Sequence, residues 1–492
     1  MLVSGDNVEN TQSVMLDQLP DDVLLEVMQH LDLPALFTCR LVCKRLGFLA
    51  LHPCAWRRRR VDYGLRRWTC PVLRLAPCLE SLELRVSSPG CHKLLSASTK
   101  CRVSELELDV ESRRAASHAC RIIRNQDDIG GLWGLTVVFK NCAPGDEAAA
   151  LLAAASLCGP EELIVNFFGY KSGPSRTSRT SVDSPVVHDT ESRSPLKRFS
   201  ASCFCPQLEP VCNSILATHA HTLEQVLVGS AKVESASGGT SYMTSVAPLL
   251  AGMPNLQDLE CPLLPGLEAV AACDSITRVF LDMVPNTARA VRSAAEFLRR
   301  AKHLRDVTLE YCGHLDGHLG VDLVLALASG RSRATVESLT FYLGDLVDVL
   351  LPSLLRALPS LPALRLLEVD DDSDELLLGI TPDTVPVLES LRILNFGYSP
   401  CAHRWLHRDS VNVLLSANPS LLLCPSYSDM FCPIDSGDEA NDSDSSSDSF
   451  DVTPCKACAM GCHQGLLDNI VLENIERQTV SSWTPLPRGV PQ

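Results

Sequence analysis

One pattern of apolar residues recurs along most of this chain, beginning at Val72. Each unit reads apolar-x-x-apolar-x-apolar, and the spacing of two between its last apolar positions is typical of a half-buried β-strand. The middle residues of the first three units, Leu82, Leu106 and Leu135, are 24 and 29 residues apart, and later steps include 27, 28, 36 and 20 residues. The units are Leu79/Leu82/Leu84, Val103/Leu106/Leu108, Leu132/Leu135/Val137, Leu163/Val165, Leu196/Phe199/Ala201, Leu223/Val226/Val228, Leu256/Leu259/Cys261, Ile276/Val279/Leu281, Leu304/Val307/Leu309, Val336/Leu339/Phe341, Leu364/Leu367/Val369 and Leu391/Leu394/Phe396. Such short strands must stack on one another, because no single unit can bury its own apolar face.

Helical patterns lie between several of these strands. They span residues 146–158, 287–302, 320–329 and 346–358, and Pro352 interrupts the last. A strand and a helix in about 27 residues resemble the leucine-rich repeat of the longer, helix-containing type. The Asn or Cys that usually follows the strand is mostly missing, with Cys312 as one match. The resemblance implies an α/β fold: a curved solenoid of parallel strands with outer helices. A generic α/β domain, with more fully apolar and less regularly spaced strands, is the alternative.

The segment before the repeats carries three short helical patterns. Pro20-Asp21-Asp22 is a helix-start signal, because a side-chain carboxylate can accept the N–H groups of a first turn. A second helix restarts at Asp32 and Pro34, and a third run covers residues 41–51 before a break at Pro53. The apolar positions are Val23, Leu24, Val27, Met28 and Leu31, then Ala35, Leu36 and Phe37, then Leu41, Val42, Leu46, Leu49 and Ala50. We expect this small bundle to carry more apolar surface than it can hide.

This segment resembles the F-box. The residues that match the family pattern are Leu19-Pro20, Leu31-Asp32-Leu33, Val42-Cys43-Lys44 and a final Trp56. Two departures are Leu46, where the family usually has Trp, and a short connection after the first helix. An ordinary helical hairpin capping a larger domain is the alternative. The resemblance implies docking on a Skp-type adaptor. The adaptor-binding positions that it implies are Leu19, Pro20, Leu24, Leu31, Leu36, Val42 and Trp56.

The two resemblances together imply a function. An F-box followed by leucine-rich repeats is similar to a substrate receptor of a Skp-cullin-F-box ubiquitin ligase. Such a receptor reaches cullin and the RING subunit through the adaptor, holds an unknown target protein on its repeats, and performs no catalysis itself. Catalysis then comes from proximity, because the target lysine is concentrated near the charged E2. One alternative is a scaffold that acts outside any cullin complex. Another is an enzyme whose chemistry lies in the Cys- and His-containing tail at residues 455–463.

Composition limits the partners and the location. The formal net charge of −16 over 492 residues argues against nucleic acid as the main partner, because phosphate binding needs a basic face. No apolar run is long enough to predict a membrane span. The first residues are polar and acidic and lack a signal-peptide pattern, so we expect a cytoplasmic or nuclear protein. The 22 cysteines are scattered, which favours reduced, buried thiols over a disulfide framework.

Two segments interrupt or follow the repeats with few core-forming residues. Residues 171–195 are rich in Ser, Thr, Pro and charge, and residues 435–451 hold seven carboxylates and no basic residue. We expect both to be disordered, because such compositions bury too little apolar surface to offset chain entropy. Possible phosphorylation sites are Ser184 and Ser194, each followed by Pro, and Ser436 and Ser445, each with an acidic residue three positions on. A purely solubilising tail is the alternative for the acidic tract.

Motifs that carry chemistry are scarce. The sequence has no P-loop, no Gly-rich dinucleotide loop and no Gly-x-Ser-x-Gly elbow. Cys455, Cys458, Cys462 and His463 include the ligand types of zinc, but the last two are adjacent and no second pair lies at finger spacing. We therefore expect no metal, no cofactor and no catalytic residue. Cys424 and Cys432 could complete a zinc site only across the acidic tract, and that site is the alternative.

The connection between the two parts is predicted to be rigid. Apolar residues continue through residues 56–75 without a Gly/Ser-rich linker. We interpret Arg57–Arg60 as the solvated face of a joining helix, with an import signal or a phosphate patch as alternatives. The predicted organisation is a disordered start (1–15), an F-box (16–61), a repeat solenoid (62–424) with an insertion (171–195), and a mostly disordered acidic, Cys-containing tail (425–492).

Overall fold

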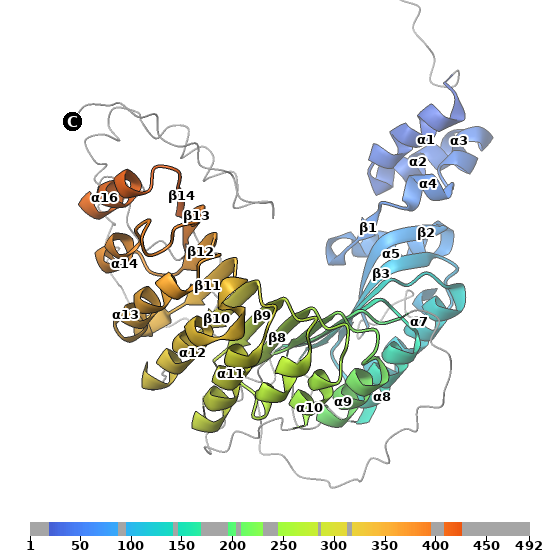
Figure 1. Cartoon of the computed structure of the whole chain (residues 1–492). Coiled ribbons are helices and arrows are strands. Elements are labelled where there is room, and N and C mark those ends of the chain that lie inside the picture. Colours follow the sequence, from blue (N-terminus) through green and yellow to red (C-terminus); the bar gives the residue numbers. More distant parts are fainter. Residues whose placement is uncertain are drawn as a thin grey trace, which may run out of the picture. The chain divides into compact units, whose positions relative to one another are not determined.

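The computed structural model describes residues 19–86, 95–140, 146–168, 195–202, 208–229, 245–283, 287–311, 317–394 and 408–425. These residues belong to two compact units, which we call the first unit (19–219) and the second unit (220–425). The first unit begins with a bundle of short helices, and both units contain parallel strands with helices packed beside them (Figure 1). The predicted α/β fold class is therefore confirmed.

The N-terminal helical segment (residues 19–56) forms four helices rather than the three predicted. They are α1 (Asp21–His30), α2 (Leu33–Val42), α3 (Lys44–Leu49) and α4 (Pro53–Trp56). Asp32 begins α2 because its Oδ1 accepts a hydrogen bond from the Ala35 N–H at 2.8 Å. Cys43 is extended, with φ −154°, and its Sγ accepts from the Leu46 N–H at 3.4 Å. This break assigns Leu41 and Val42 to the end of α2, so the predicted third run from 41 to 51 is wrong at its start.

The strands of the first unit follow the helical segment directly. Its elements after α4 are β1 (Arg60–Val61), η2 (Tyr63–Leu65), α5 (Arg66–Leu75), β2 (Cys78–Arg85), β3 (Arg102–Val110), α7 (Arg113–Ile129), β4 (Gly134–Lys140), α8 (Asp146–Leu157), β5 (Glu162–Phe168), β6 (Arg198–Ala201) and α9 (Glu209–Thr218). Each strand pairs in parallel with the next, and equivalent residues of the sequence pattern are partners, for example Leu82 with Leu106. The repeated strand pattern thus predicts the register as well as the strands.

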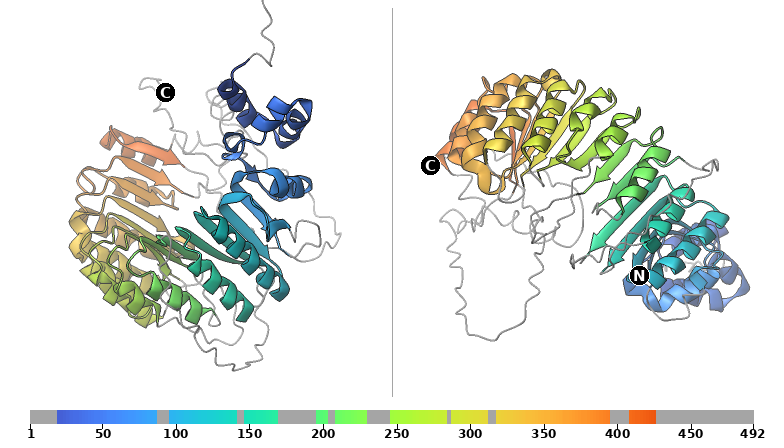
Figure 2. Two further views of the ribbon diagram at one scale, coloured as in Figure 1. Left: turned by 90° about the vertical axis from the view of Figure 1, so that its right-hand side faces the viewer. Right: turned by 90° about the horizontal axis from the view of Figure 1, so that it is seen from below.

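The second unit continues the same alternation of strand and helix. Its strands are β7 (Gln225–Val228), β8 (Asp258–Pro262), β9 (Arg278–Asp282), β10 (Asp306–Glu310), β11 (Ser338–Tyr342), β12 (Leu366–Val369), β13 (Ser390–Ile393) and β14 (Leu422–Pro425). Its helices are α10 (Val246–Ala251), η3 (Leu267–Ala272), α11 (Ala288–Arg300), α12 (Gly317–Ser329), η4 (Arg331–Ala334), η5 (Gly344–Leu346), α13 (Val347–Ala357), η6 (Leu358–Ser360), α14 (Asp374–Gly379) and α16 (Asp409–Ala417). The strands pair in parallel in chain order, and α11 to α13 lie in a row on one side of them (Figure 2).

The core of each unit lies between the strands and the helices. The second and third apolar positions of the strand pattern are buried in the repeats from β2 to β12, as in Leu339 and Phe341 of β11. The twelfth unit is an exception: β13 buries Leu391 and Ile393, not Leu394, and Phe396 lies outside the described residues. The prediction was out of register there because two apolar patterns overlap in Leu391-Arg392-Ile393-Leu394. Helix α13 also continues through Pro352 instead of stopping at it.

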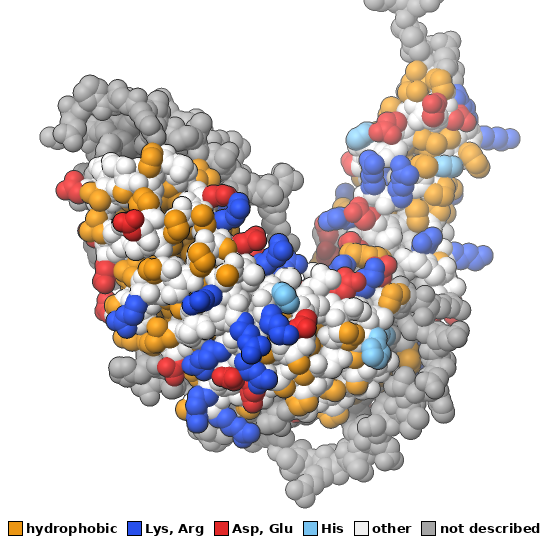
Figure 3. All heavy atoms as spheres, viewed as in Figure 1, with side chains coloured by type: hydrophobic (Ala, Val, Ile, Leu, Met, Phe, Trp, Pro, Cys, Tyr) orange, Lys and Arg blue, Asp and Glu red, His pale blue; other side chains and the backbone are white. Residues whose placement is uncertain are grey.

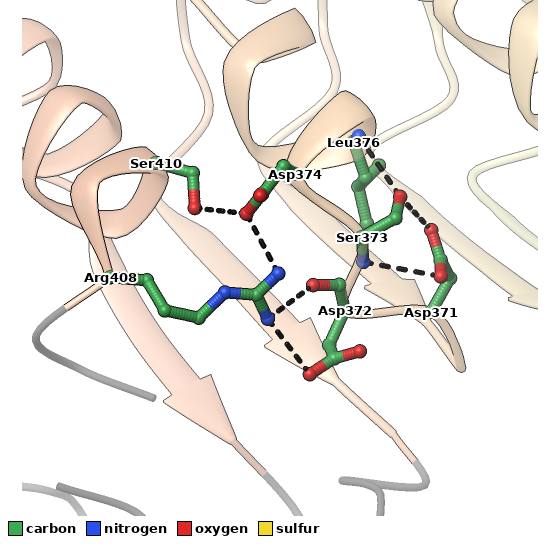
Figure 4. Close-up of polar contacts among 7 residues, drawn as sticks. All are labelled: Asp371, Asp372, Ser373, Asp374, Leu376, Arg408 and Ser410. Atoms are coloured by element: carbon green, nitrogen blue, oxygen red, sulfur yellow. Dashed lines mark hydrogen bonds and ion pairs between the residues drawn. The ribbon is translucent and has the colours of Figure 1, made fainter. Parts of the chain in front are cut away.

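A charged network connects the last two helices of the second unit (Figure 4). Arg408, just before α16, donates from Nη1 to the backbone oxygen of Asp372 at 3.0 Å and from Nη2 to Oδ1 of Asp374 at 2.7 Å. Ser410 donates a second hydrogen bond to the same Asp374 oxygen. Ser373 begins α14 by accepting from the Leu376 N–H. The carboxylates of Asp372 and Asp374 therefore join neighbouring repeats, whereas that of Asp371 accepts from Ser373 within the same turn.

Several predicted features lie outside the described residues. They are the start of the chain, Cys312, residues 171–194 of the insertion, the four serines named above, Cys432, residues 435–451 and the 455–463 cluster. Among the helices of the described ranges, none combines the length and the apolar character needed to span a bilayer.

Candidate functional site

Three of the seven predicted adaptor-binding residues form the core of the N-terminal helical segment. Leu24, Leu36 and Trp56 are 2%, 1% and 0% exposed. The indole Nε1 of Trp56 donates a hydrogen bond to the backbone oxygen of Ala50 at 2.7 Å, and Phe37 meets the Trp56 ring edge-on at 5.8 Å between centroids. A side chain without accessible surface cannot contact a partner directly. We therefore assign these three residues to holding the helices together, in place of the surface role that the resemblance implies.

Other apolar side chains of the same segment are exposed to solvent. Leu41 and Val42 at the end of α2 are 81% and 65% exposed, and Phe48 on α3 is 71% exposed. Val23 and Val27 lie four residues apart on α1, so they share one side of that helix, and both are more than two-fifths exposed. Because α3 packs against α1 and α2, these exposed apolar residues belong to three neighbouring helices. Figure 3 shows hydrophobic side chains on the surface of this part of the chain.

The Leu-Pro step is fixed to α3 by one arginine. Arg45 donates from Nη2 to the backbone oxygen of Leu19 at 2.6 Å and from Nε to Oδ1 of Asp21 at 2.8 Å. Pro20 is exposed and directly precedes α1, and its backbone oxygen accepts from the Leu24 N–H. Leu19, Pro20 and Val42 therefore keep accessible surface. Leu31, at the end of α1, is half-buried. The structure thus leaves four of the seven implied positions available to a partner.

Arg59 has a structural role that the sequence did not predict. Its guanidinium donates to the backbone oxygens of Met28 at 2.6 Å and Leu31 at 2.7 Å, which are orphan carbonyls at the end of α1, and to that of Ala55 at 2.7 Å. Burial lowers the pKa of Arg59, partly offset by the carboxylate of Asp32. The arginine run was expected to be the solvated face of a joining helix. Arg57, Arg58 and Arg60 are exposed, but the run forms a turn that leads into β1 and not a helix, and Arg59 is half-buried.

The junction between helices and strands is apolar, as predicted. Phe37 of α2 stacks on Trp68 of α5 with ring centroids 5.3 Å apart, while Val61 and Val72 are 1% and 0% exposed. The backbone oxygen of Arg59 accepts from the N–H groups of residues 80 and 81, and β1 pairs with β2. The helical segment and the first strands therefore share one continuous core within the first unit.

The side of β2 to β4 that faces away from the helices is partly covered by Tyr63. The guanidinium of Arg85 and the ammonium of Lys140 lie 5.5 and 5.6 Å from the centroid of its ring. Lys140 Nζ is also 2.7 Å from Oδ2 of Asp109, whose side chain is fully buried. Burial, followed by the carboxylates of Asp109 and Glu107, raises the pKa of Tyr63. The chain's own residues supply most of the partners in this cluster, but Oδ1 of Asp109 and Nε of Arg85 are buried without a hydrogen-bond partner.

Three of the described thiols are poor nucleophiles. Burial raises the pKa of Cys101 to about 12 and, with Asp127 nearby, that of Cys158 to about 12 as well. Burial likewise raises the pKa of Cys261. Because the thiolate is the reactive form, none of these three is suited to thiol chemistry near neutral pH. Within the described ranges, no group of three or more His, Cys, Asp or Glu side chains is placed to hold a metal ion.

A comparison with protein families identifies the helical segment. Residues 16–62 match the family described as F-box-like. The chain contains an F-box-like domain. The matched residues begin just before the described Leu19 and end one residue after β1, so the F-box-like domain includes α1 to α4 and the Arg59 contacts.

Among curated proteins, no match to the chain was found. Among solved structures, the chain is similar to one described as the crystal structure of the Rad7 and Elc1 complex in yeast, at 11% identity and a TM-score of 0.33. That match covers 77% of this chain and 93% of the other. At this identity and TM-score, the similarity carries no argument about fold or function.

Sequence analysis did not predict that Val23, Val27, Leu41 and Phe48 are exposed. The observation that could have predicted it is that the bundle has more apolar residues than its one small core can bury. Periodicity alone cannot show which of the apolar residues are exposed, because a short helix with apolar residues on more than one side can face the core with either side.

Proposed function

We propose that the protein is the substrate-recognition subunit of a Skp-cullin-F-box ubiquitin ligase. The F-box-like domain binds a Skp-type adaptor, and the adaptor connects the chain to cullin and the RING subunit. The observation that carries this proposal is the group of exposed apolar side chains on an F-box-like domain whose core is already complete. Exposed residues such as Leu41 and Phe48 gain stability only by burial against a partner.

The exposed residues supply a substantial part of the free energy of an interface. Burying a Leu, Val or Phe side chain contributes about 1.5–3 kcal/mol. The three most exposed residues, Leu41, Val42 and Phe48, therefore supply roughly 4–9 kcal/mol before association costs are subtracted. Val23, Val27 and the Leu19-Pro20 step extend the contact. This mode is the burial of apolar helical residues in a partner's hydrophobic groove.

The strand-and-helix repeats hold the target protein in this proposal. We interpret them as degenerate leucine-rich repeats of the longer type, whose strands present a surface away from the helices. The chain acts without catalytic residues or cofactor, and ubiquitin transfer is performed by the E2 that the RING subunit recruits. The apolar junction at Phe37 and Trp68 supports this division of labour, because it holds the first repeats against the adaptor-binding domain.

Co-purification from cells tests the proposal. The surface variant Leu41→Ser/Val42→Ser/Phe48→Ser should lose adaptor and cullin together while keeping the melting temperature of the wild type. The matched control is Leu157→Ser/Leu378→Ser/Val413→Ser, which removes three other exposed apolar residues, at 53%, 50% and 52% exposure, and should keep both partners.

Two outcomes would contradict the proposal in different ways. Normal adaptor binding by the surface variant would refute the adaptor interface. Adaptor binding by the wild type without any cullin would instead favour a scaffold that acts outside a cullin complex. The core variant Leu24→Ala separates folding from binding, because it should lower the melting temperature through a cavity that costs about 2–5 kcal/mol.

A further inference from the structure

Three exposed arginines of the second unit have no partner in the part of the chain that the structure describes. Arg300 ends α11, and Arg331 and Arg333 lie on η4, the short helix that precedes β11. None of the three guanidinium groups has a hydrogen bond or an ion pair with a described residue. The neighbouring Arg299, by contrast, pairs with Glu296 at 3.5 Å. The unpaired guanidinium groups are therefore available to a ligand.

One buried serine fixes the place where these arginines meet. Ser332 lies between Arg331 and Arg333, is fully buried, and donates from its hydroxyl to the backbone oxygen of Ala301 at 2.6 Å. Ala301 directly follows Arg300 at the end of α11. The three arginines therefore flank a single contact between α11 and η4. Figure 3 shows Lys and Arg side chains gathered over this part of the surface.

A hollow of about 390 Å³ lies next to this contact. Its lining residues precede β9, β10 and β11 in three successive repeats, and they are Asp274, Thr277, His303, Arg305 and Thr335. The Arg305 N–H donates to the backbone oxygen of Thr277 at 2.8 Å, which joins two of these segments. The Thr335 hydroxyl donates to the backbone oxygen of Ser332 at 2.9 Å, so the hollow adjoins η4.

The carboxylates around the hollow already have cationic partners. Asp274 lies 2.9 Å from Nζ of Lys302, and Glu337 lies 3.7 Å from Nη1 of Arg305. The three unpaired arginines therefore leave an excess of positive charge at this edge, although the formal net charge of the whole chain is −16. We call this surface the basic edge, and it consists of Arg300, Lys302, His303, Arg305, Arg331 and Arg333.

The chemistry of the basic edge suits a phosphate. A guanidinium presents a planar fork of donors that binds two phosphate oxygens at once, and a phosphorylated side chain carries a charge of about −2. A long polyanion such as nucleic acid would also meet the negative field of the rest of the chain. A short segment interacts mainly within one Debye length, about 8 Å at physiological salt. The basic edge therefore favours a short phosphorylated segment of a protein.

We propose that the basic edge docks a segment of the target protein that carries phosphorylated serine or threonine. The phosphate pairs with the three arginines around Ser332, and a neighbouring acidic group of the segment enters the hollow beside His303 and Arg305. Clusters of arginine are a recurring mode of binding phosphorylated and acidic motifs. This inference rests on the proposed function, because it assigns the chemistry of the target that the repeats hold.

A direct binding measurement tests the inference without the ligase. The probe is a short fluorescent peptide of glycine and serine with two phosphoserines, titrated with the full-length chain and followed by fluorescence anisotropy. We expect saturable binding that weakens as salt rises and is at least about tenfold tighter than that of the unphosphorylated peptide. The variant Arg300→Gln/Arg331→Gln/Arg333→Gln should bind the phosphopeptide at least about tenfold more weakly. Its melting temperature should equal that of the wild type, because these guanidinium groups have no partner among the described residues.

Two further variants separate recognition from general charge attraction. The matched control Arg114→Gln/Arg121→Gln/Arg124→Gln removes three exposed arginines from α7 of the first unit. It loses the same charge and should bind the phosphopeptide within about twofold of the wild type. The variant Arg300→Lys/Arg331→Lys/Arg333→Lys keeps the charge but loses the planar fork, so it should bind at least about threefold more weakly than the wild type.

Several results would overturn the inference. They are equal binding of the phosphorylated and unphosphorylated peptides, equal losses in the two glutamine variants, and no binding by the wild type. Tighter binding of a single-stranded oligonucleotide with the same charge as the phosphopeptide would also overturn it, in favour of nucleic acid. Adaptor co-purification by the glutamine variant of the basic edge is expected to be normal, so that measurement tests the proposed function separately.

Discussion

Replacing Arg59 tests whether one side chain holds the end of α1 against α4 within the F-box-like domain. The guanidinium makes three hydrogen bonds to backbone oxygens, at 2.6, 2.7 and 2.7 Å, two of them at the end of α1. Hydrogen bonds from charged donors contribute about 1.5–3 kcal/mol each when buried. Arg59 is only half-buried, so part of that gain is lost to water, and we expect Arg59→Met to cost about 2–4 kcal/mol in total.

This cost is large enough to measure in thermal unfolding. For a unit of about 200 residues, each kcal/mol lowers the melting temperature by about 2–4 °C, so the expected fall is roughly 4–16 °C. Tryptophan fluorescence is a suitable readout, because Trp56 and Trp68 both contact Phe37 at the junction. Methionine retains most of the aliphatic stem, so the change isolates the guanidinium. Arg58→Met is the control, because Arg58 is exposed, and it should melt with the wild type. Equal melting temperatures for the two variants would refute the structural role of Arg59.

Three further predictions concern the junction, Glu260 of β8 and the tail. Trypsin should cut within residues 171–193 before it cuts within residues 57–67, although the latter range holds six arginines. The reason is that the junction is packed against α1 and β2. Early cleavage at the junction would indicate a flexible tether. Burial raises the pKa of Glu260 to about 7 in the folded chain, from an ordinary value of 4.5. Between pH 4.5 and pH 7 the folded state therefore binds more protons than the unfolded state, so the free energy of unfolding falls as pH rises through this range. Glu260→Gln should therefore melt higher than the wild type at pH 8 but not at pH 4, and the reverse order would show that Glu260 is stabilised as a carboxylate. Deleting residues 435–451 should leave the melting temperature unchanged, because seven carboxylates without a basic residue cannot pack; a clear fall would show that the tract contacts the folded units.

Much of the fold was predictable from the sequence because it depends on local patterns. Alternating apolar residues predict strands such as β3 and β10, and the repeated spacing predicts their parallel register, since equivalent residues must meet for one core to continue. The cap at Asp32 likewise follows from side-chain chemistry within one turn, whereas α1 begins at Asp21 without the side-chain cap that the sequence predicted. The twelfth unit was misplaced by three residues because both Leu391 and Leu394 fit the same pattern, and only pairing with β12 selects one of them.

The candidate site was less predictable, because it depends on which side of each short helix faces inward. The sequence by itself determined that the first 61 residues carry surplus apolar side chains and that the repeats must stack. Only the tertiary structure decided that Leu24, Leu36 and Trp56 fill the core while Leu41 and Phe48 remain exposed. It also decided that the Arg59 guanidinium donates hydrogen bonds to the backbone oxygens of Leu31 and Met28, which lie 28 and 31 residues earlier in the chain. The physical reason is the same in both cases: burial and long-range hydrogen bonds are set by contacts between elements distant in sequence, and a local pattern contains no information about them.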